Sequence, residues 1–196
     1  MTRYLTEFRY AFFISALCFI WLMLEYVAGF HDKYVQYHTF ISVLSIVIPL
    51  VFYFLAIIKK RDDELDGIIS FRQAVLSGLT ITIIWIVLTV PTQLVFHYMI
   101  NPRFFDVMIE EYVYHAVDKG MSEELANESA AALFNIKAYL IQRLITVLIV
   151  GVSLSIIDAW FLKRTVKPEE LIAESPLDDT EQLDEPLTKD STVIKK

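Results

Sequence analysis

The sequence is poor in cysteine, glycine and proline, and it carries no excess of basic residues. Its 196 residues include one cysteine (Cys18), five glycines and six prolines, and the formal net charge is −7 at pH 7. A single thiol excludes a disulfide framework and a thiolate metal cluster. An acidic chain lacks the basic face that phosphate backbones require, so nucleic acid is not an expected partner.

Long apolar blocks are what the sequence has instead. Hydrophobic residues make up 56% of the chain, and the mean hydropathy is +0.50. About 20 apolar residues in a helix cross a bilayer core roughly 30 Å thick. Blocks of this length predict four transmembrane helices, at about residues 9–30, 39–58, 72–98 and 138–162. The expected fold is an all-α membrane protein, with residues 1–164 forming a four-span domain surrounded by the lipid bilayer.

Basic residues at the span ends predict the orientation, because lysine and arginine are retained on the cytoplasmic side. If both termini are cytoplasmic, the inside set is Arg3, Arg9, Lys59, Lys60, Arg61, Arg72, Lys163, Arg164 and Lys167, and the outside set is Lys33, Arg103, Lys119 and Lys137. The larger inside set favours this orientation. The first apolar run ends in Glu25 without a small-residue cleavage site, so it reads as a retained anchor.

Two segments lie outside the predicted spans. Residues 101–136 form an extracytoplasmic segment in which apolar residues recur at helical spacing from Phe104 to Ala116. This pattern predicts an amphipathic helix ended by Gly120. Ser122 caps a second helix, which is expected to continue unbroken into the fourth span. Residues 165–196 hold three prolines and nine acidic residues and predict a disordered cytoplasmic tail, serving either as a docking peptide or to aid solubility.

Ionisable residues inside the spans define the candidate site, since such residues are costly in a bilayer and usually face a partner or a cavity. Counting at 1.5 Å per residue puts Glu25 and Arg143 both roughly 9 Å below the outer boundary, which predicts an ion pair between them. Gln93 and His97 share a helix face at this level. The candidate cluster is Glu25, Gln93, His97, Gln142 and Arg143, capped by His31 and Asp32. Asp158 is a separate candidate near the inner face, within reach of Arg9 and Arg72.

The cluster has two main interpretations. Either it holds the helices together through hydrogen bonds, or it forms a cavity that binds a polar solute or moves protons. Neither a metal nor a cofactor is expected, because only His97 of the four histidines lies at a span end and no ligand spacing recurs. An enzyme is not expected either, because no serine and histidine share a depth. Gly78, Gly151 and Ser155 predict close helix packing.

Two functions therefore remain open. The first is a non-enzymatic membrane protein that acts by association with itself or with a membrane complex. The alternative is a small transporter-like protein that uses the polar cluster.

Short motifs along the chain carry a resemblance to a known family. These are Glu25 with Gly29 and His31-Asp32; Phe71-Arg72-Gln73 with Ser77-Gly78; Pro91-Thr92-Gln93 with His97; Asn101-Pro102-Arg103-Phe104-Phe105; Lys119-Gly120-Met121; and Asn135-Ile136-Lys137-Ala138-Tyr139 with Gln142. In their order and spacing, the chain resembles, over about residues 7–164, the bacterial four-helix membrane proteins grouped as domain of unknown function 4199. The resemblance implies four spans in the inner membrane, no assigned activity and no catalytic residue. The acidic tail departs from the family pattern.

Overall fold

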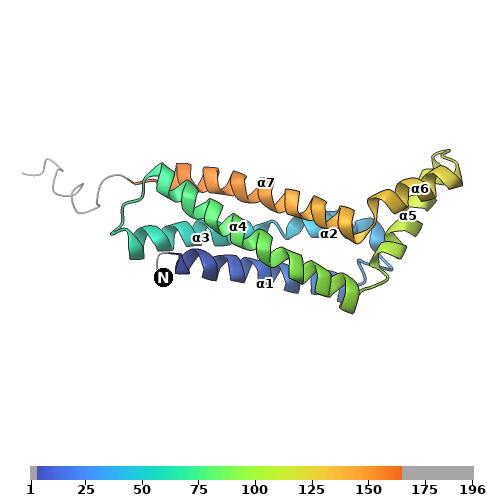
Figure 1. The fold of residues 1–196 in the computed structure, drawn as a ribbon, viewed down its shortest axis with the longest axis horizontal. Coiled ribbons are helices and arrows are strands. Elements are labelled where there is room, and N and C mark those ends of the chain that lie inside the picture. The colour runs from blue at the N-terminus through green and yellow to red at the C-terminus, as the bar shows by residue number, and fades with distance from the viewer. Residues whose placement is uncertain (1–3, 165–196) are drawn as a thin grey trace, which may run out of the picture. The chain divides into compact units, whose positions relative to one another are not determined.

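The computed structural model describes residues 4–164 as a series of helices joined by short turns (Figure 1). The elements are α1 (Leu5–Val27), the 3₁₀ turn η1 (Val35–Tyr37), α2 (His38–Leu44), α3 (Val47–Glu64), α4 (Phe71–Val95), the π-helix η2 (Phe96–Ile100), α5 (Phe104–Asp118), α6 (Glu123–Leu133) and α7 (Ile136–Leu162). The predicted tail, residues 165–196, lies outside the described residues.

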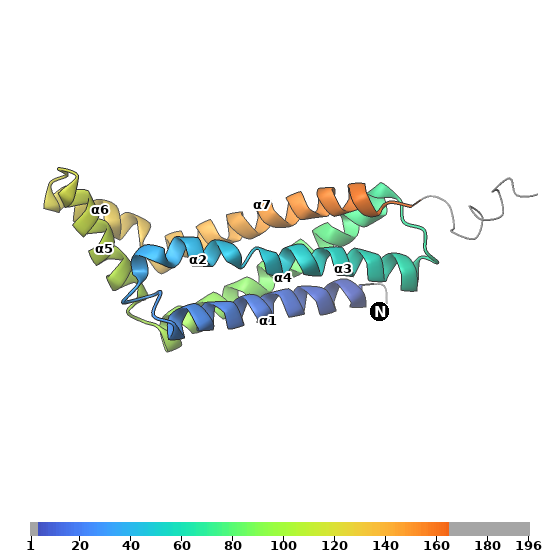
Figure 2. The same cartoon turned by 180° about the vertical axis from the view of Figure 1, so that it is seen from behind.

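Four of these stretches have the length and apolar composition needed to cross a membrane. They are Leu5–Val27, Val35–Glu64, Phe71–Ile100 and Ile136–Leu162. The predicted all-α membrane fold with four long apolar helices is therefore confirmed. The four stretches run alongside one another, and α5 and α6 lie beyond one end of the bundle (Figures 1 and 2). We call this the hairpin end, and we call the opposite end, where α1 begins and α7 ends, the termini end.

Small residues let α4 and α7 pack closely, as the sequence predicts. A Cβ added to Gly78 would lie 2.4 Å from Ser155 Oγ, and one added to Gly151 would lie 2.5 Å from Thr82 Cγ2. The Tyr53 hydroxyl lies 2.9 Å from Thr82 Oγ1, so α3 joins the same contact. This packing forms the core of the bundle.

The second apolar stretch is broken, in contrast to the continuous helix expected over residues 39–58. It divides into α2 and α3 at Ser45 and Ile46. Pro49 has no N–H to donate to the Ser45 carbonyl, which accepts a hydrogen bond from Ile48 N at 3.1 Å instead. Ser45 Oγ also donates to the Ser42 carbonyl, at 2.7 Å. Figure 2 shows the break as a short interruption between α2 and α3.

The expectation of one unbroken helix from Ser122 into the last span is wrong. Ser122 does cap α6, because its side chain accepts from Leu125 N, but α6 ends at Leu133. Asn135 then has an extended backbone, and its side chain accepts a hydrogen bond from Ala138 N at 2.9 Å. Asn135 is therefore the N-cap of a separate helix, α7.

Candidate functional site

A tight chain reversal after α1 builds the polar site at the hairpin end. Gly29 has φ +84°, a left-handed conformation that glycine adopts without strain. Phe30 N donates to the Glu25 carbonyl at 3.0 Å, and Tyr34 N donates to the Gly29 carbonyl at 2.9 Å. The reversal carries His31 back over the last turn of α1, next to the Glu25 side chain.

Glu25 lies at the centre of the site, and its side chain is only 3% exposed. Its Oε2 accepts a hydrogen bond from Ser42 Oγ at 2.8 Å and lies 3.3 Å from His31 Nε2 and 3.9 Å from His38 Nε2. The indole N–H of Trp21 donates to the other carboxylate oxygen, Oε1. A turn, α1 and α2 thus direct four polar groups at one buried carboxylate. Among the described residues, Glu25, His31 and His38 also form a group that could hold a metal ion, which the ligand spacing in the sequence did not indicate.

Aromatic rings close the site on the side facing α5. The His31 ring centroid lies 5.4 Å from Phe96 and 5.2 Å from Phe104, and Phe104 also lies 5.6 Å from His38. Phe104 is 1% exposed. These apolar rings limit the access of water, and they strengthen the electrostatic interactions of the groups that they cover.

The predicted ion pair between Glu25 and Arg143 is not formed. Within residues 4–164, no charged nitrogen and oxygen of these two side chains come within 4.0 Å, and Arg143 forms no ion pair at all. Depth counting gives the height of a residue along its helix but not the helix that it faces. Here α1 packs mainly against α3 and α4, while Arg143 projects from α7.

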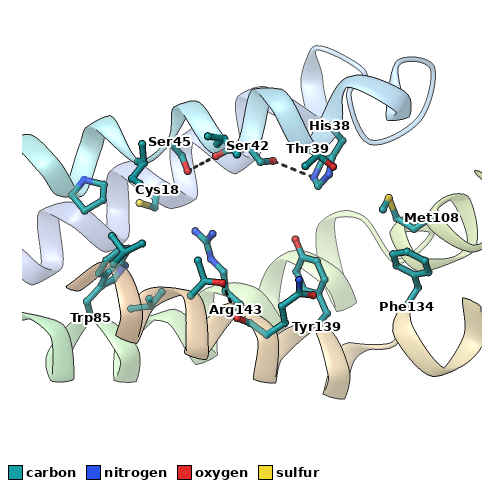
Figure 3. Close-up of a pocket in the computed structure, with 17 residues that line it drawn as sticks. Cys18, His38, Thr39, Ser42, Ser45, Trp85, Met108, Phe134, Tyr139 and Arg143 are labelled. Atoms are coloured by element: carbon teal, nitrogen blue, oxygen red, sulfur yellow. Dashed lines mark hydrogen bonds between the residues drawn. The ribbon is translucent and has the colours of Figure 1, made fainter. Parts of the chain in front are cut away.

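Arg143 and Gln142 instead line a cavity of about 410 Å³ between the α2–α3 stretch and α7. The cavity is lined by Cys18, His38, Thr39, Ser42, Val43, Ser45, Ile46, Pro49, Trp85, Met108, Phe134, Tyr139, Gln142, Arg143, Thr146, Val147 and Val150. Figure 3 shows Arg143 on α7 facing Ser42 and Ser45 across the opening. No carboxylate belongs to this lining. Arg143 Nε is buried without a hydrogen-bond partner among the described residues.

Gln93 and His97 point into the bundle, at 7% and 3% exposure, but neither contacts Glu25 through a hydrogen bond. The His97 ring packs 4.8 Å from Phe104 and 5.1 Å from Tyr139. Both ring nitrogens of His97 and Oε1 of Gln93 lack hydrogen-bond partners within the part of the chain that the structure describes. The predicted cluster therefore separates into three parts. They are the Glu25 group (Glu25 with Trp21, His31, His38 and Ser42), the His97 group (His97 and Gln93) and the Arg143 cavity. Asp32, predicted to cap it, is exposed.

Asp158 lacks the arginine partners that the sequence suggested. It is 5% exposed, and no ion pair to it is found within residues 4–164, where Arg9 and Arg72 are both exposed. A buried acid that does have an ion pair at the termini end is Glu7, which the sequence analysis missed. Glu7 forms an ion pair with Lys60 and accepts a hydrogen bond from Ser77 Oγ at 3.0 Å.

Some of the missed residues had a detectable signal. Trp21 precedes Glu25 by four positions, and His38 precedes Ser42 by four, so each pair shares a helix face. His31 and His38 also bracket the short turn between the first two spans. The contact between the two histidines depends on the path of that turn, which helical periodicity does not describe.

Comparison with known proteins gives a family but no characterised relative. The model of the family described as "Protein of unknown function (DUF4199)" matches residues 9–164. No curated protein and no solved structure matches the chain. The matched region covers all four long helices apart from the first residues of α1, together with the Glu25 group and the Arg143 cavity. The chain therefore belongs to this family of proteins of unknown function, DUF4199.

Proposed function

We propose that this protein is a non-enzymatic membrane protein that binds a small amphiphilic anion in the cavity beside Arg143. The proposal develops the transporter-like alternative of the sequence analysis. The observation that carries it is the half-buried Arg143 side chain, which has no ion pair within residues 4–164 and lies on the wall of a cavity of about 410 Å³. The volume lies within the range of small-molecule sites.

The charge of the cavity selects the ligand class. An arginine is protonated under all ordinary conditions, and placing it in a membrane segment without a counter-charge is costly. The hydroxyls of Ser42, Ser45 and Thr146 stand in the same lining. These hydroxyls already donate within the protein: Ser42 Oγ to Glu25 Oε2, Ser45 Oγ to the Ser42 carbonyl and Thr146 Oγ1 to the Gln142 carbonyl. The free donor is the Arg143 guanidinium, whose Nε has no hydrogen-bond partner among the described residues. A carboxylate or phosphate group would supply the missing negative charge and accept hydrogen bonds from it.

The rest of the cavity favours an apolar body on the ligand. Trp85, Phe134, Ile46 and Val150 contribute apolar side chains to the lining. Val43 of α2 and Thr146 of α7 are exposed at the edges, so the cavity opens between these two helices. A ligand with an anionic head and a short alkyl chain matches this distribution, and so does the head of an anionic lipid.

Cys18 provides a direct assay, because the chain's single thiol lies in the cavity lining. The protein is placed in phosphatidylcholine nanodiscs, and the rate of Cys18 modification by methyl methanethiosulfonate is measured with and without octyl phosphate. A bound anion shields the thiol, so the rate should fall about tenfold at ten times the dissociation constant. Uncharged octanol should give little protection at the same concentration.

Arg143→Gln is the test variant and Arg103→Gln the matched control, because Arg103 is exposed at the same end and does not line the cavity. Loss of a charge-assisted contact should weaken octyl phosphate binding about tenfold or more in the first variant only. Equal protection in wild type and Arg143→Gln, or equal protection by octanol, contradicts the proposal. Protection by added phosphatidylglycerol without octyl phosphate would identify a lipid headgroup as the anion.

Association remains a second candidate function, supported by the surface of the α5–α6 hairpin. Tyr114, Val117 and Leu125 are 69%, 42% and 51% exposed there. Exposed apolar side chains on a segment that the sequence places outside the bilayer are suited to a protein partner or a second copy. The measurement is the oligomeric state of the wild type and of Tyr114→Ser in nanodiscs. A monomeric wild type, or an oligomer that Tyr114→Ser leaves unchanged, would argue against self-association through this surface.

We also propose a location in the bacterial inner membrane with both termini cytoplasmic. The distribution of lysine and arginine at the span ends supports this orientation. The hairpin end, with the Arg143 cavity, would then face the extracytoplasmic side.

A further inference from the structure

Three ligating side chains that the proposed anion site does not require converge on one point at the hairpin end. Glu25, His31 and His38 are 3%, 2% and 7% exposed, and each offers one ligand atom within 4.8 Å of the other two. We propose that these three residues bind a divalent transition-metal ion, with zinc as the best-fitting ion. This site goes beyond the function proposed above and does not depend on it.

The separation of the ligand atoms is close to that of a metal site. Glu25 Oε2 lies 3.3 Å from His31 Nε2 and 3.9 Å from His38 Nε2. Ligands bound 2.0–2.1 Å from a tetrahedral zinc ion lie about 3.3–3.4 Å from one another. The first separation already has this value, and the second is longer, at 3.9 Å. All three ligand atoms lie within 4.8 Å of one another, so a bound ion would draw the two histidines inward.

The donor set selects the class of metal. Two imidazoles and one carboxylate are the protein ligands of zinc sites that keep a fourth position open, and they also suit Fe²⁺. Zinc binds such sites more tightly than Fe²⁺ in the usual affinity order. The absence of a thiolate among the three donors argues against Cu⁺, which prefers sulfur.

Neighbouring groups hold two of the ligands in place. The Trp21 indole N–H donates to Glu25 Oε1, which leaves Oε2 turned toward the histidines. The His31 ring is packed between Phe96 and Phe104, with centroids 5.4 and 5.2 Å away. A hydrogen-bonded partner such as Trp21 usually contributes tenfold to a hundredfold in metal affinity. His31 is held by ring packing, because its Nδ1 has no hydrogen-bond partner among the described residues.

The fourth coordination position would lie on the cavity side. Ser42 Oγ is 2.8 Å from Glu25 Oε2 and 3.3 Å from His38 Nε2, and both Ser42 and His38 line the cavity. A water molecule or a ligand atom reaching the ion would approach past Ser42. The site is therefore an open one, accessible to exchange, rather than a closed structural site.

A hydrogen-bonded cluster without metal is the competing explanation for the same contacts. In that case Glu25 would be held by the hydrogen bonds from Trp21 and Ser42 and by its contact with His31. The chain contains a natural comparison, the exposed pair of His115 and Glu111 on α5, whose charged atoms lie 3.1 Å apart. Within residues 4–164 this pair has one histidine and no third ligand, so it should not bind a metal tightly.

Cobalt binding distinguishes the two explanations. The full-length protein is purified in a neutral detergent, freed of its affinity tag, stripped of metal with a chelator and titrated with Co²⁺. We expect one equivalent of cobalt with the visible absorption of a tetrahedral complex, displaced by one equivalent of Zn²⁺. Zinc should also raise the melting temperature in a concentration-dependent way, because it binds only the folded state.

His31→Gln and His38→Gln should each weaken cobalt binding by at least about tenfold. Removing a group that only supports a metal ligand already costs about tenfold in metal affinity, and removing the ligand itself should cost at least as much. His115→Gln should bind as wild type does, and Arg143→Gln should retain the metal, which separates this site from the anion site. The proposal is overturned if the folded wild type gives no tetrahedral cobalt spectrum, or if His38→Gln binds cobalt unchanged. Should the histidine variants fail to fold, the wild-type and His115→Gln titrations decide the question by themselves.

Discussion

The two ends of the bundle each bury a glutamate from α1, but they surround it with different partners. At the termini end, Glu7 forms an ion pair with Lys60 and accepts a hydrogen bond from Ser77. At the hairpin end, Glu25 faces His31 and His38. A lysine beside a carboxylate keeps its charge, whereas a histidine can be neutral, protonated or bound to a metal.

At the termini end the buried glutamate has a fixed counter-charge, whereas at the hairpin end Glu25 has no lysine or arginine within ion-pair distance among the described residues. The side chains of Glu7 and Lys60 are 1% and 12% exposed, and the pair balances its own charge. The Glu25 group has no fixed positive charge and borders the cavity through His38 and Ser42. Glu7 therefore needs no ligand to balance its charge, whereas Glu25 would gain a counter-charge from the metal ion proposed above.

The largest expected effect comes from removing the lysine at the termini end. Lys60→Met keeps the length of the side chain but leaves Glu7 buried without a counter-charge, which should cost about 3–5 kcal/mol. The measurement is the melting temperature in neutral detergent. The neighbouring Lys59→Met is the matched control, because Lys59 and Asp63 form an exposed pair. If both variants melt alike, the termini end does not depend on its ion pair.

A smaller loss is expected at the hairpin end in the metal-free protein. Glu25→Gln preserves the shape of the side chain and its bond from Trp21, but it removes the charge that Ser42 and His31 face. Hydrogen bonds to charged groups are worth about 1.5–3 kcal/mol, so the melting temperature should fall by less than in Lys60→Met. Glu111→Gln on the exposed face of α5 serves as the control. A Glu25→Gln protein that melts at or above wild type would mean that Glu25 is an uncompensated acid.

The sequence predicts the features that depend on composition along a single helix. Long apolar stretches predicted the four membrane helices, because a bilayer allows few other structures for such segments. Gly78, Gly151 and Ser155 predicted the close packing that the structure contains. Ser122 was correctly predicted to cap α6, whereas Asn135, an equally good cap, went unnoticed because the apolar pattern on either side of it is continuous.

The candidate site was less predictable, because it depends on how helices face one another. Depth correctly brought Glu25 and Arg143 to the same end of the bundle, but it could not show that α1 packs mainly on α3 and α4. The two histidines reach Glu25 through a reversal at Gly29 and a helix that breaks before Pro49. Turn geometry of this kind leaves little trace in hydrophobic periodicity.

The smallest effect, and the one opposite in sign, is expected for the acid that has no partner. Asp158 on α7 is 5% exposed, and its Oδ2 has no hydrogen-bond partner among residues 4–164. Asp158→Asn breaks no ion pair and removes the cost of burying a carboxylate, so the melting temperature should stay the same or rise. The melting temperatures of Asp158→Asn and wild type are compared in the same neutral detergent that is used for Lys60→Met. A clear drop would show that Asp158 does stabilise the bundle, and the view that charge balance at the termini end rests on Glu7 and Lys60 would then be incomplete.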